Sequence, residues 1–406
     1  MSKTRIVHII NSFEFGGAEA MLCNLLLRTD RSRFEPSVVS LIDRLTVAEP
    51  VRRADIPLVT MGMTPGVPDP RGLARLAQHL RRLRPHVIHT WMDHSNLIGG
   101  LAARMAGRTN VVWGVHHSEH VRGVAKRSTL MTVAACAVLS RRLASRIVCC
   151  SEHSRVLYAK QGFAFERLMV IPNGFDTDRF RPDAAARRAV RAELKVDDTT
   201  PLVGLVARFD PFKDHATFLQ AAAALRKARP DVRFVLCGTK VDRTNHELTA
   251  LVDELGLNGC VHLLGTRRDV PRVLAAIDVL ASSSISEAFP LAVGEAMSCG
   301  VTCVVTEVGD SALIVGPTGR VVPPRDPRAL ADALGAVLSM PLERRRELGQ
   351  DARKRIVERF DLSAVTRSYE NVYDELVAGR HLHHRRARSP VPSRAVPVPA
   401  LVPAAG

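Results

Sequence analysis

The sequence has few aromatic side chains. Phe, Trp and Tyr together make up 4% of the residues, with only two Trp and three Tyr. Surfaces that hold bases or sugars by stacking depend on aromatic rings. We therefore do not expect a groove lined with aromatic residues to be the main binding device.

The sequence also lacks a long hydrophobic run. No uncharged apolar stretch reaches the roughly 18 to 20 residues that span a bilayer, and the nearest, residues 128–140, lies between Arg127 and Arg141. The N-terminal residues enter a strand pattern without the charged, apolar and cleavage regions of a secretory leader. We expect a cytoplasmic protein that does not span a membrane, and peripheral docking on the inner face of the plasma membrane stays open.

The cysteines show no metal or disulfide pattern. None of the eight forms a C-x-x-C pair, and most lie in apolar runs, which predicts reduced, buried thiols rather than disulfides or zinc ligands. The eight positions are Cys23, Cys136, Cys149, Cys150, Cys237, Cys260, Cys299 and Cys303.

Positive charge is concentrated in the first part of the chain. The net charge is +16, and residues 1–172 hold 24 Lys and Arg against 12 Asp and Glu. Residues 173–379 are close to neutral, and residues 380–406 carry five Arg and no acidic residue. Such a field attracts polyanions: nucleic acid, an anionic bilayer or a phosphorylated acceptor. Charge alone does not choose between these partners.

Strand and helix patterns alternate along the chain, which predicts an α/β fold with two doubly wound parallel sheets. Residues 171–176 (IPNGFD) interrupt the alternation and separate two similar series. The first series of strands is expected at residues 5–11, 34–41, 86–91, 110–117 and 146–151, and the second at 201–208, 232–238, 260–265, 278–284 and 301–306.

The pattern also predicts the domain boundaries. We expect one Rossmann-like domain over residues 1–172 and a second over 173–361, facing each other across a central cleft. Residues 362–379 place Val365, Tyr369, Val372 and Leu376 at helical spacing and are predicted to form a closing helix. Residues 380–406 are rich in Arg, Pro and Ala without periodicity, which indicates a disordered basic tail.

The most informative segment is residues 282–305. Glu287 is expected in a turn after a strand, Pro290 at the first position of a helix, and Glu295 one and a half turns into that helix. Free backbone N–H groups of Phe289 and Leu291 at the helix start favour a phosphate or a hydroxyl-rich ligand. Paired carboxylates accept hydrogen bonds from adjacent sugar hydroxyls. A surface loop with two solvated glutamates would show the same pattern.

Residues 287–295 (EAFPLAVGE) resemble the Glu-x7-Glu motif of the retaining glycosyltransferase family four, which has the GT-B fold. Four further segments resemble motifs of that family in the same order, so the resemblance covers roughly residues 4–378. They are FGGAE at 15–19, IPNGFDTDRFRP at 171–182, VARFDPFKDH at 206–215 and VGDSALIVGPTGRVVPPRDP at 308–327.

The resemblance implies roles for most of these residues. Glu287 would bind the hexose and Glu295 the ribose of a nucleoside diphosphate sugar, mainly on the second domain. Arg208 and Lys213 would stabilise the departing diphosphate, although by pattern alone they are equally well ordinary surface cations. Gly16 and Gly17 would close over the phosphate from the acceptor-side first domain, a weak signal by itself because G-x-G-x-x-G is absent.

Four other positions have less definite implications. The family places a histidine near the donor sugar, and the doublet His116 and His117 leaves open which one faces the site, with His117 preferred. Arg268 is a candidate contact to the base, and Asp310 lies on the late nucleotide-side loop.

Two features limit the resemblance. Many family members have a second glycine where this chain has Lys240, so the contact of Lys240 with the donor stays open. Asp176 and Asp178 form a D-x-D, but they lie in the interdomain segment rather than after a strand, which favours a turn or cap role over metal binding.

The sequence predicts a retaining, metal-independent hexosyltransferase that needs no cofactor. Its donor would be a UDP-sugar or GDP-sugar and its acceptor a glycan or lipid-linked hydroxyl, in cell-surface polysaccharide or lipid-linked glycan assembly. A GT-B sugar-nucleotide 2-epimerase is the alternative within the same fold. A basic nucleic-acid-binding protein is the alternative of another class, but it leaves the paired glutamates unexplained and no nucleic-acid-binding signature is present.

Overall fold

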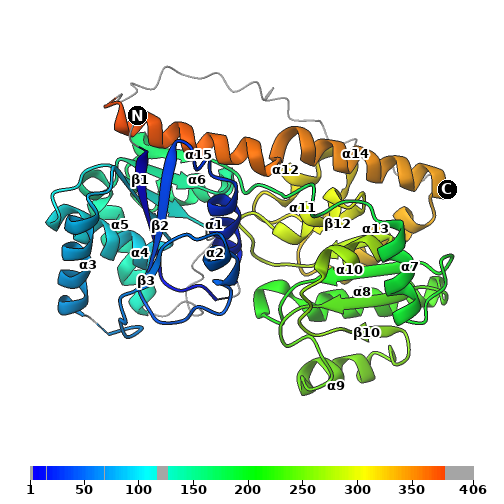
Figure 1. Cartoon of the computed structure of the whole chain (residues 1–406). Helices are drawn as coiled ribbons and strands as arrows, with labels where there is room; N and C mark the ends of the chain where they lie inside the picture. Colours follow the sequence, from blue (N-terminus) through cyan, green and yellow to red (C-terminus); the bar gives the residue numbers. More distant parts are fainter. Residues whose placement is uncertain (1–2, 15, 68, 117–126, 380–406) are drawn as a thin grey trace, which may run out of the picture.

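The computed structural model describes residues 3–14, 16–67, 69–116 and 127–379. Two lobes lie side by side, and the last two helices run along both of them (Figure 1). His117 and the basic tail predicted at residues 380–406 lie outside the described residues.

The first lobe is a seven-stranded parallel sheet in the order β3-β2-β1-β4-β5-β6-β7. Its strands are β1 (Thr4–Ile10), β2 (Phe34–Ser40), β3 (Leu58–Thr60), β4 (Val87–Trp91), β5 (Val111–Val115), β6 (Arg146–Cys149) and β7 (Leu168–Val170). Its helices are α1 (Gly17–Arg28), α2 (Glu49–Arg53), α3 (Pro70–Leu83), α4 (Asp93–Met105), α5 (Arg127–Leu143), α6 (Glu152–Lys160) and the 3-10 turn η1 (Phe165–Arg167).

The second lobe repeats this design with six parallel strands in the order β10-β9-β8-β11-β12-β13. Its strands are β8 (Leu202–Val206), β9 (Arg233–Cys237), β10 (Val261–Leu263), β11 (Val279–Ser282), β12 (Thr302–Thr306) and β13 (Arg320–Val322). Its helices are α7 (Ala184–Glu193), η2 (Pro211–Lys213), α8 (His215–Ala228), α9 (His246–Glu254), α10 (Val270–Ala276), α11 (Leu291–Ser298), α12 (Ser311–Val315), η3 (Gly316–Thr318), α13 (Pro327–Leu338) and α14 (Leu342–Phe360).

Each sheet is covered by helices on both faces, because its strands are apolar on both sides. In β1, Ile6, Val7, Ile9 and Ile10 are all buried, but alternate residues pack into different cores. One core contains residues of α3, α4 and α5, and the other contains residues of α1 and of the last helix, α15 (Leu362–Val377). This confirms the prediction of doubly wound sheets.

The closing helix predicted at residues 362–379 is α15, and its four predicted core residues are buried in the first lobe. The preceding helix α14 packs on α11 of the second lobe, so the chain crosses between the lobes at Asp361 (Figure 1). The other crossing, near Phe175, is hydrogen-bonded to it: Phe175 N–H donates to Phe360 O at 2.9 Å, and Leu362 N–H donates to Phe175 O at 3.0 Å. The two lobes are therefore joined by a paired hinge.

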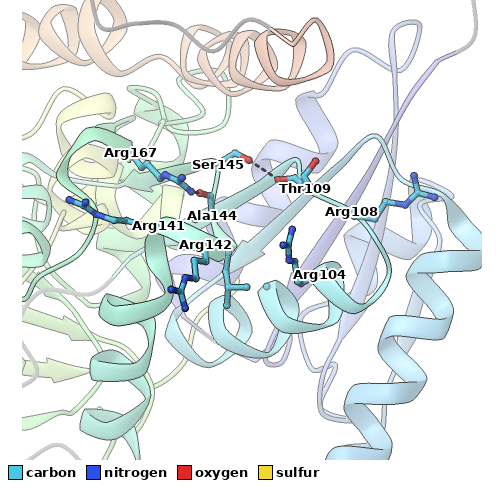
Figure 2. A pocket seen from close by; sticks show the side chains of 10 residues that line it. Arg104, Arg108, Thr109, Arg141, Arg142, Ala144, Ser145 and Arg167 are labelled. Carbon is cyan, nitrogen blue, oxygen red and sulfur yellow. Dashed lines mark hydrogen bonds between the residues drawn. The ribbon is translucent and has the colours of Figure 1, made fainter.

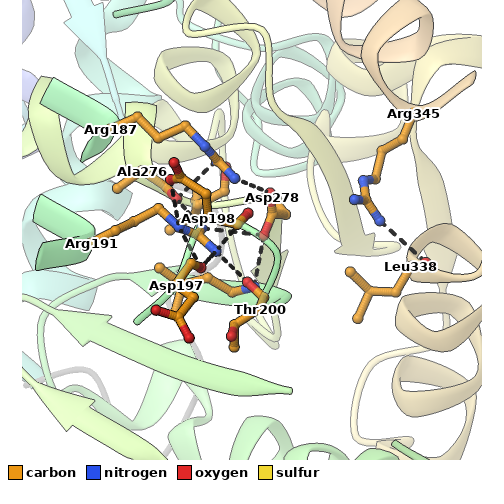
Figure 3. A network of polar contacts seen from close by, with 11 residues as sticks. Arg187, Arg191, Asp197, Asp198, Thr200, Ala276, Asp278, Leu338 and Arg345 are labelled. Atoms are coloured by element: carbon orange, nitrogen blue, oxygen red, sulfur yellow. Dashed lines mark hydrogen bonds and ion pairs between the residues drawn. The ribbon is translucent and has the colours of Figure 1, made fainter. Parts of the chain in front are cut away.

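A buried ion pair ties α7 to the second sheet (Figure 3). Arg191, which is 1% exposed, lies 3.4 Å from the carboxylate of Asp278, and its guanidinium also donates to the carbonyls of Ala276 and Asp197. Asp278 pairs in addition with Arg187 at 2.8 Å and accepts a hydrogen bond from the N–H of Leu202. The arginine charge is thus balanced at the edge where β8 and β11 begin.

The cysteines agree with the prediction of reduced, buried thiols, since all eight are free and seven are buried. Among the helices of the described residues, none is long and apolar enough to cross a membrane.

Candidate active site

The loop that follows β8 carries Arg208 and Lys213. Asp210 orders this loop, because its carboxylate accepts a hydrogen bond from Phe212 N–H at 2.9 Å and lies 3.1 Å from Arg208 Nε. Lys213 ends the turn η2, and Asp214 then caps α8 by accepting from Thr217 N–H. The Arg208 side chain is 54% exposed, which leaves part of its guanidinium open to a ligand.

Lys213 and Glu287 meet although they are 74 positions apart. The ammonium of Lys213 pairs with Glu287 Oε1, and the hydroxyl of Ser284 donates to the same oxygen at 2.8 Å. Ser283 donates its hydroxyl hydrogen to the carbonyl of Lys213, also at 2.8 Å. This contact follows from the sheet order, because β8 and β11 are adjacent parallel strands whose carboxyl ends lie at one edge.

The backbone around Glu287 is packed against the loop that follows β12. Gly309 has φ of +52°, and a Cβ atom there would lie 2.1 Å from the carbonyl oxygen of Glu287. Only glycine fits this position, both for its backbone angle and for the close approach. The next residue, Asp310, donates its N–H to the carbonyl of Ala288 at 3.1 Å. The turn that carries Glu287 is thus supported from two sides.

The helix after this turn, α11, begins at Leu291 with Pro290 as its N-cap, one residue later than the sequence predicts. The Phe289 side chain is buried and stacks on Phe175, with ring centroids 5.9 Å apart. Phe289 and Pro290 can therefore offer a ligand their backbone rather than their side chains. Leu291 is half-buried.

Glu295 lies in α11 as the sequence predicts, and it is half-buried. Burial raises the pKa of its carboxyl to about 7, and the positive charge of Arg179 opposes this rise. Within the described part of the chain, no hydrogen bond or ion pair holds this carboxylate. It is an acceptor without a donor, which suits a pair of sugar hydroxyls.

The first lobe reaches this site through the start of α1. A Cβ atom at Gly17 would lie 3.6 Å from Leu291 Cδ1, so the starts of α1 and α11 touch across the lobes. Gly16 is the N-cap of α1, and the carboxylate of Glu19 folds back over it. Burial raises the pKa of Glu19, while its own backbone hydrogen bond and the charge of Arg208 lower it. Glu19 and Arg208 therefore interact across the interlobe junction.

His116 follows β5 and stacks on Trp91, with ring centroids 4.8 Å apart and planes 16° apart. Trp91 belongs to a buried aromatic group that also contains His8, His89, Tyr369 and Tyr373. This packing gives His116 a structural contact, and which histidine of the doublet faces the donor stays a prediction.

Two other predicted positions, Arg268 and Lys240, lie around the second sheet. Arg268 is exposed, and among the described residues it has no hydrogen-bond or ion-pair partner, unlike its neighbour Arg267, which pairs with Glu193 and Asp269. Lys240 is exposed with φ of +61°, a backbone conformation that favours glycine. A glycine, which the family resemblance leads us to expect at this position, would adopt this conformation without strain.

The D-x-D segment forms a turn in the structure. Asp176 accepts hydrogen bonds from the N–H groups of Asp178 and Arg179, and both aspartates pair with Arg28 of α1, at 3.1 and 3.4 Å. Of the turn and cap roles that the sequence favours, the structure shows the turn. In the part of the chain that the structure describes, no group of three or more His, Cys, Asp or Glu residues is placed to hold a metal ion.

Sequence reasoning assigned Asp310 to the nucleotide-side loop and missed its main contact. Its carboxylate oxygens accept hydrogen bonds from the N–H groups of Glu152, at 2.8 Å, and His153, at 3.0 Å. These two residues begin α6, so Asp310 of the second lobe caps a helix of the first. Local pattern carries no signal for a partner 158 positions away. Glu19 was also missed as an individual residue, although it stands in the FGGAE motif.

Comparisons with known proteins agree with this geometry. The model of glycosyl transferases group 1 matches residues 186–355, and that of glycosyltransferase family 4 matches residues 15–179. The UDP-Gal:alpha-D-GlcNAc-diphosphoundecaprenol alpha-1,3-galactosyltransferase of Escherichia coli is 24% identical over 319 residues, which cover 77% of this chain and 81% of that protein. The D-inositol 3-phosphate glycosyltransferase of Corynebacterium jeikeium is 32% identical over 230 residues, 54% of each chain.

A solved structure shows the same fold over nearly the whole described chain. Anabaena Alr3699/HepE, in complex with UDP and glucose, superposes with a TM-score of 0.80 at 23% identity, covering 91% of this chain and 99% of the other. The two sheets, the crossing helix and the family matches to both lobes therefore lead to one conclusion. The chain is a GT-B protein that belongs to the glycosyl transferases group 1 family.

Proposed function

We propose that this protein is a retaining, metal-independent hexosyltransferase that uses a nucleoside diphosphate sugar. The observation that carries the proposal is the pairing of Lys213 with Glu287, together with the carboxylate of Glu295 in the helix that follows, which has no partner among the described residues. Cations for a diphosphate and acceptors for sugar hydroxyls are thereby assembled at the carboxyl ends of two adjacent strands.

UDP is the first donor nucleotide to test. The Anabaena neighbour is solved in complexes with UDP, glucose and UDP-glucose, and the name of the Escherichia coli relative gives UDP-galactose as its donor. In the proposed complex, Glu295 accepts hydrogen bonds from the ribose and Glu287 from the hexose. The backbone at Phe289–Leu291 and at Gly16–Gly17 lies against the phosphates.

Arg208 and Lys213 would contribute most of the stabilisation of the transition state. When the bond between the sugar and the diphosphate breaks, negative charge develops on the leaving phosphate oxygen. Fixed cations aimed at that oxygen stabilise the transition state more than the ground state. The same oxygen accepts the proton of the attacking acceptor hydroxyl, which enters on the face that the diphosphate leaves. Retention of configuration follows without an enzymic nucleophile.

The contacts of Glu287 favour a binding role over a nucleophilic one. Its Oε1 already accepts from Lys213 and Ser284, and each such bond withdraws electron density from the carboxylate. A carboxylate fixed in this way holds hydroxyl donors well and attacks carbon poorly. Glu287 is thus proposed to orient the hexose while Lys213 connects it to the diphosphate.

The acceptor is proposed to be a glycan or lipid-linked hydroxyl that approaches from the first lobe. The Escherichia coli relative is named for a diphosphoundecaprenol acceptor, which is a lipid-linked glycan. The excess of 24 basic over 12 acidic residues in residues 1–172 would draw this lobe to an anionic membrane face. Assembly of a cell-surface polysaccharide or lipid-linked glycan fits such an acceptor.

The test combines nucleotide binding with turnover. Thermal unfolding is measured with UDP, GDP and their hexose conjugates, since a ligand at 100 times its Kd adds about 2.7 kcal/mol to stability. Turnover of the best donor is then compared for Glu287→Ala and for Glu307→Ala, an exposed residue of the same lobe. Glu287→Ala is expected to lower turnover at least about 100-fold, as loss of about 3 kcal/mol of stabilisation does, and Glu307→Ala to leave it unchanged.

Two results would refute parts of the proposal. Glu287→Ala turnover within about twofold of wild type would remove Glu287 from the site. Release of an epimerised sugar from donor alone, without any acceptor, would favour the sugar-nucleotide 2-epimerase.

A further inference from the structure

A pocket lined by arginines lies on the first lobe, away from the candidate active site. Its volume is about 180 Å³, and five arginines line it: Arg104, Arg108, Arg141, Arg142 and Arg167 (Figure 2). Arg104 lies in the last turn of α4, and Arg141 and Arg142 lie in the last turn of α5. These helix ends lie beside the edge at which β5 and β6 begin. The candidate active site is at the opposite edge, where the strands end.

The positive charge of this arginine pocket is not balanced. Arg141 lies 3.5 Å from Glu166, and Arg167 donates to the carbonyl of Ala144. Burial lowers the pKa of Arg167, Glu166 opposes that change, and the nearby positive charges of Arg141 and Arg146 lower the pKa further.

The other three arginines have no hydrogen bond or ion pair with any described residue, and Nε of Arg108 is shielded from solvent without a partner. One glutamate and two helix ends of about −0.5 charge each cannot neutralise five guanidinium groups. The pocket therefore carries an excess of positive charge that an anionic group can balance.

The helix that leads to the pocket has an uncovered apolar face. Helix α5 has no charged residue from 128 to 140. Met131 and Val138, two turns apart on one side of this helix, are 72% and 80% exposed, and Ala134 between them is exposed as well. Phe165 of η1, two residues before Arg167, is 62% exposed. Exposed apolar side chains beside a cluster of cations are typical of surfaces that meet a bilayer interface.

We propose that the arginine pocket and the outer face of α5 form one surface that docks on an anionic lipid bilayer, with a lipid phosphate held by the arginines and Met131 and Val138 in the headgroup region. One guanidinium group can donate two parallel hydrogen bonds to the oxygens of one phosphate. The arginines therefore suit a lipid phosphate held at a fixed position. A nucleic acid would satisfy the arginines but would offer nothing to the apolar face.

The position of α5 gives this surface a role in the reaction. The helix connects β5 to β6, so it runs back from the edge that holds the candidate active site to the edge that holds the pocket. Its 17 residues span about 25 Å at 1.5 Å per residue. A bilayer along this helix would present a lipid-linked acceptor at the first-lobe side of the site. This role, unlike the docking itself, rests on the proposed transferase function.

The experiment measures binding of the full chain to vesicles of phosphatidylcholine with and without phosphatidylglycerol. Two double variants test the surface: Arg104→Ala with Arg142→Ala, which removes two unpaired exposed cations, and Met131→Gln with Val138→Gln. The matched controls are Arg243→Ala with Arg328→Ala, exposed arginines of the second lobe without ion-pair partners, and Leu313→Gln, which is 45% exposed.

We expect binding only to the vesicles that contain phosphatidylglycerol. The arginine variant should bind about thirtyfold more weakly, because each cation near an anionic surface adds about 1 kcal/mol and a factor of ten equals 1.4 kcal/mol. The apolar variant should also bind at least tenfold more weakly, and the controls should stay within about threefold of wild type.

Three results would overturn the inference. They are equal binding to both kinds of vesicle, an equal loss in the control variants, or a selective loss of duplex nucleic-acid binding in the arginine variant without any loss on vesicles. UDP-induced thermal stabilisation, measured on the same samples, separates this inference from the proposed function. Stabilisation without vesicle binding refutes the docking surface alone, and vesicle binding without stabilisation by any nucleotide refutes the transferase site alone.

Discussion

Replacing Glu295 with glutamine should stabilise the unliganded protein, and the gain should depend on pH. Burial raises the pKa of this carboxyl from 4.5 to about 7. An acid whose pKa is higher in the folded state binds its proton more tightly there. Folding is therefore penalised as pH rises from 4.5 to 7, and the full penalty persists above 7. Glutamine removes the penalty because it stays neutral.

The size of the effect follows from the two pKa values. At 1.36 kcal/mol for each pH unit between them, the full penalty is about 3 kcal/mol, reached near pH 8, and at pH 5 it is about 1 kcal/mol. Glu295→Gln should therefore gain about 2 kcal/mol more at pH 8 than at pH 5. For a domain of this size, 1 kcal/mol shifts Tm by about 2–4 °C, so the melting temperatures should diverge by about 4–8 °C between these pH values.

The assay is thermal unfolding of wild type and variant at both pH values, with Glu307→Gln as the matched control. Glu307 is exposed in the same lobe, and its substitution should change stability by less than about 0.5 kcal/mol. UDP should reverse the order at pH 5, where the gain is only about 1 kcal/mol, and reduce the difference at pH 8: if ribose hydroxyls donate to Glu295, the variant loses about 1.5–3 kcal/mol of nucleotide binding. A Tm difference between wild type and Glu295→Gln that does not change with pH would refute the assignment of a buried, proton-binding carboxyl at this position.

Three further predictions concern other contacts. Asp278→Ala should lower the free energy of unfolding, measured in urea, by about 3–5 kcal/mol, because it leaves the buried Arg191 charge without the carboxylate of Asp278. Adding Arg191→Met should recover part of that loss. If the effects of the two substitutions on stability simply added, the ion pair would be contradicted. Asp310→Ala should cost about 1–2 kcal/mol and increase the radius of gyration in small-angle scattering, since it removes the interlobe hydrogen bonds to the first two N–H groups of α6 and leaves only the cap from Ser151; an unchanged radius would show that these bonds do not hold the lobes together. Lys240→Gly should stabilise by up to about 1 kcal/mol, because φ is +61°, and a loss of stability would indicate a contact of the lysine side chain.

The fold could be predicted because its long strands are apolar and regularly spaced. The three-residue strands β3, β7 and β13 were missed, since segments such as Leu58–Thr60 are too short to show a period. The sequence assigns Arg320–Val322 to a loop, and its first two residues, Arg320 and Val321, are exposed. Edge strands of this kind are defined by pairing with a neighbour, which composition does not reveal.

The candidate site could be predicted where its residues follow adjacent strands. Lys213 and Glu287 each stand in the segment that follows an apolar strand, and parallel strands bring such segments to one edge. The pKa of Glu295 could not be predicted, because it depends on how deeply α11 is packed rather than on its sequence. The interaction of Glu19 with Arg208 was missed for a related reason, since it requires the relative position of two lobes.

The loop after β12 links the shape of the donor site to the position of the lobes. Gly309 touches the backbone of Glu287, and its neighbour Asp310 caps α6 of the first lobe. A rotation of the lobes about the hinge at Phe175 must break the cap or move this loop, and moving the loop shifts the backbone of Glu287, whose carbonyl lies against Gly309. Two adjacent residues therefore couple lobe closure to the placement of the carboxylate that would hold the sugar. We therefore expect Asp310→Ala to lower turnover as well as stability.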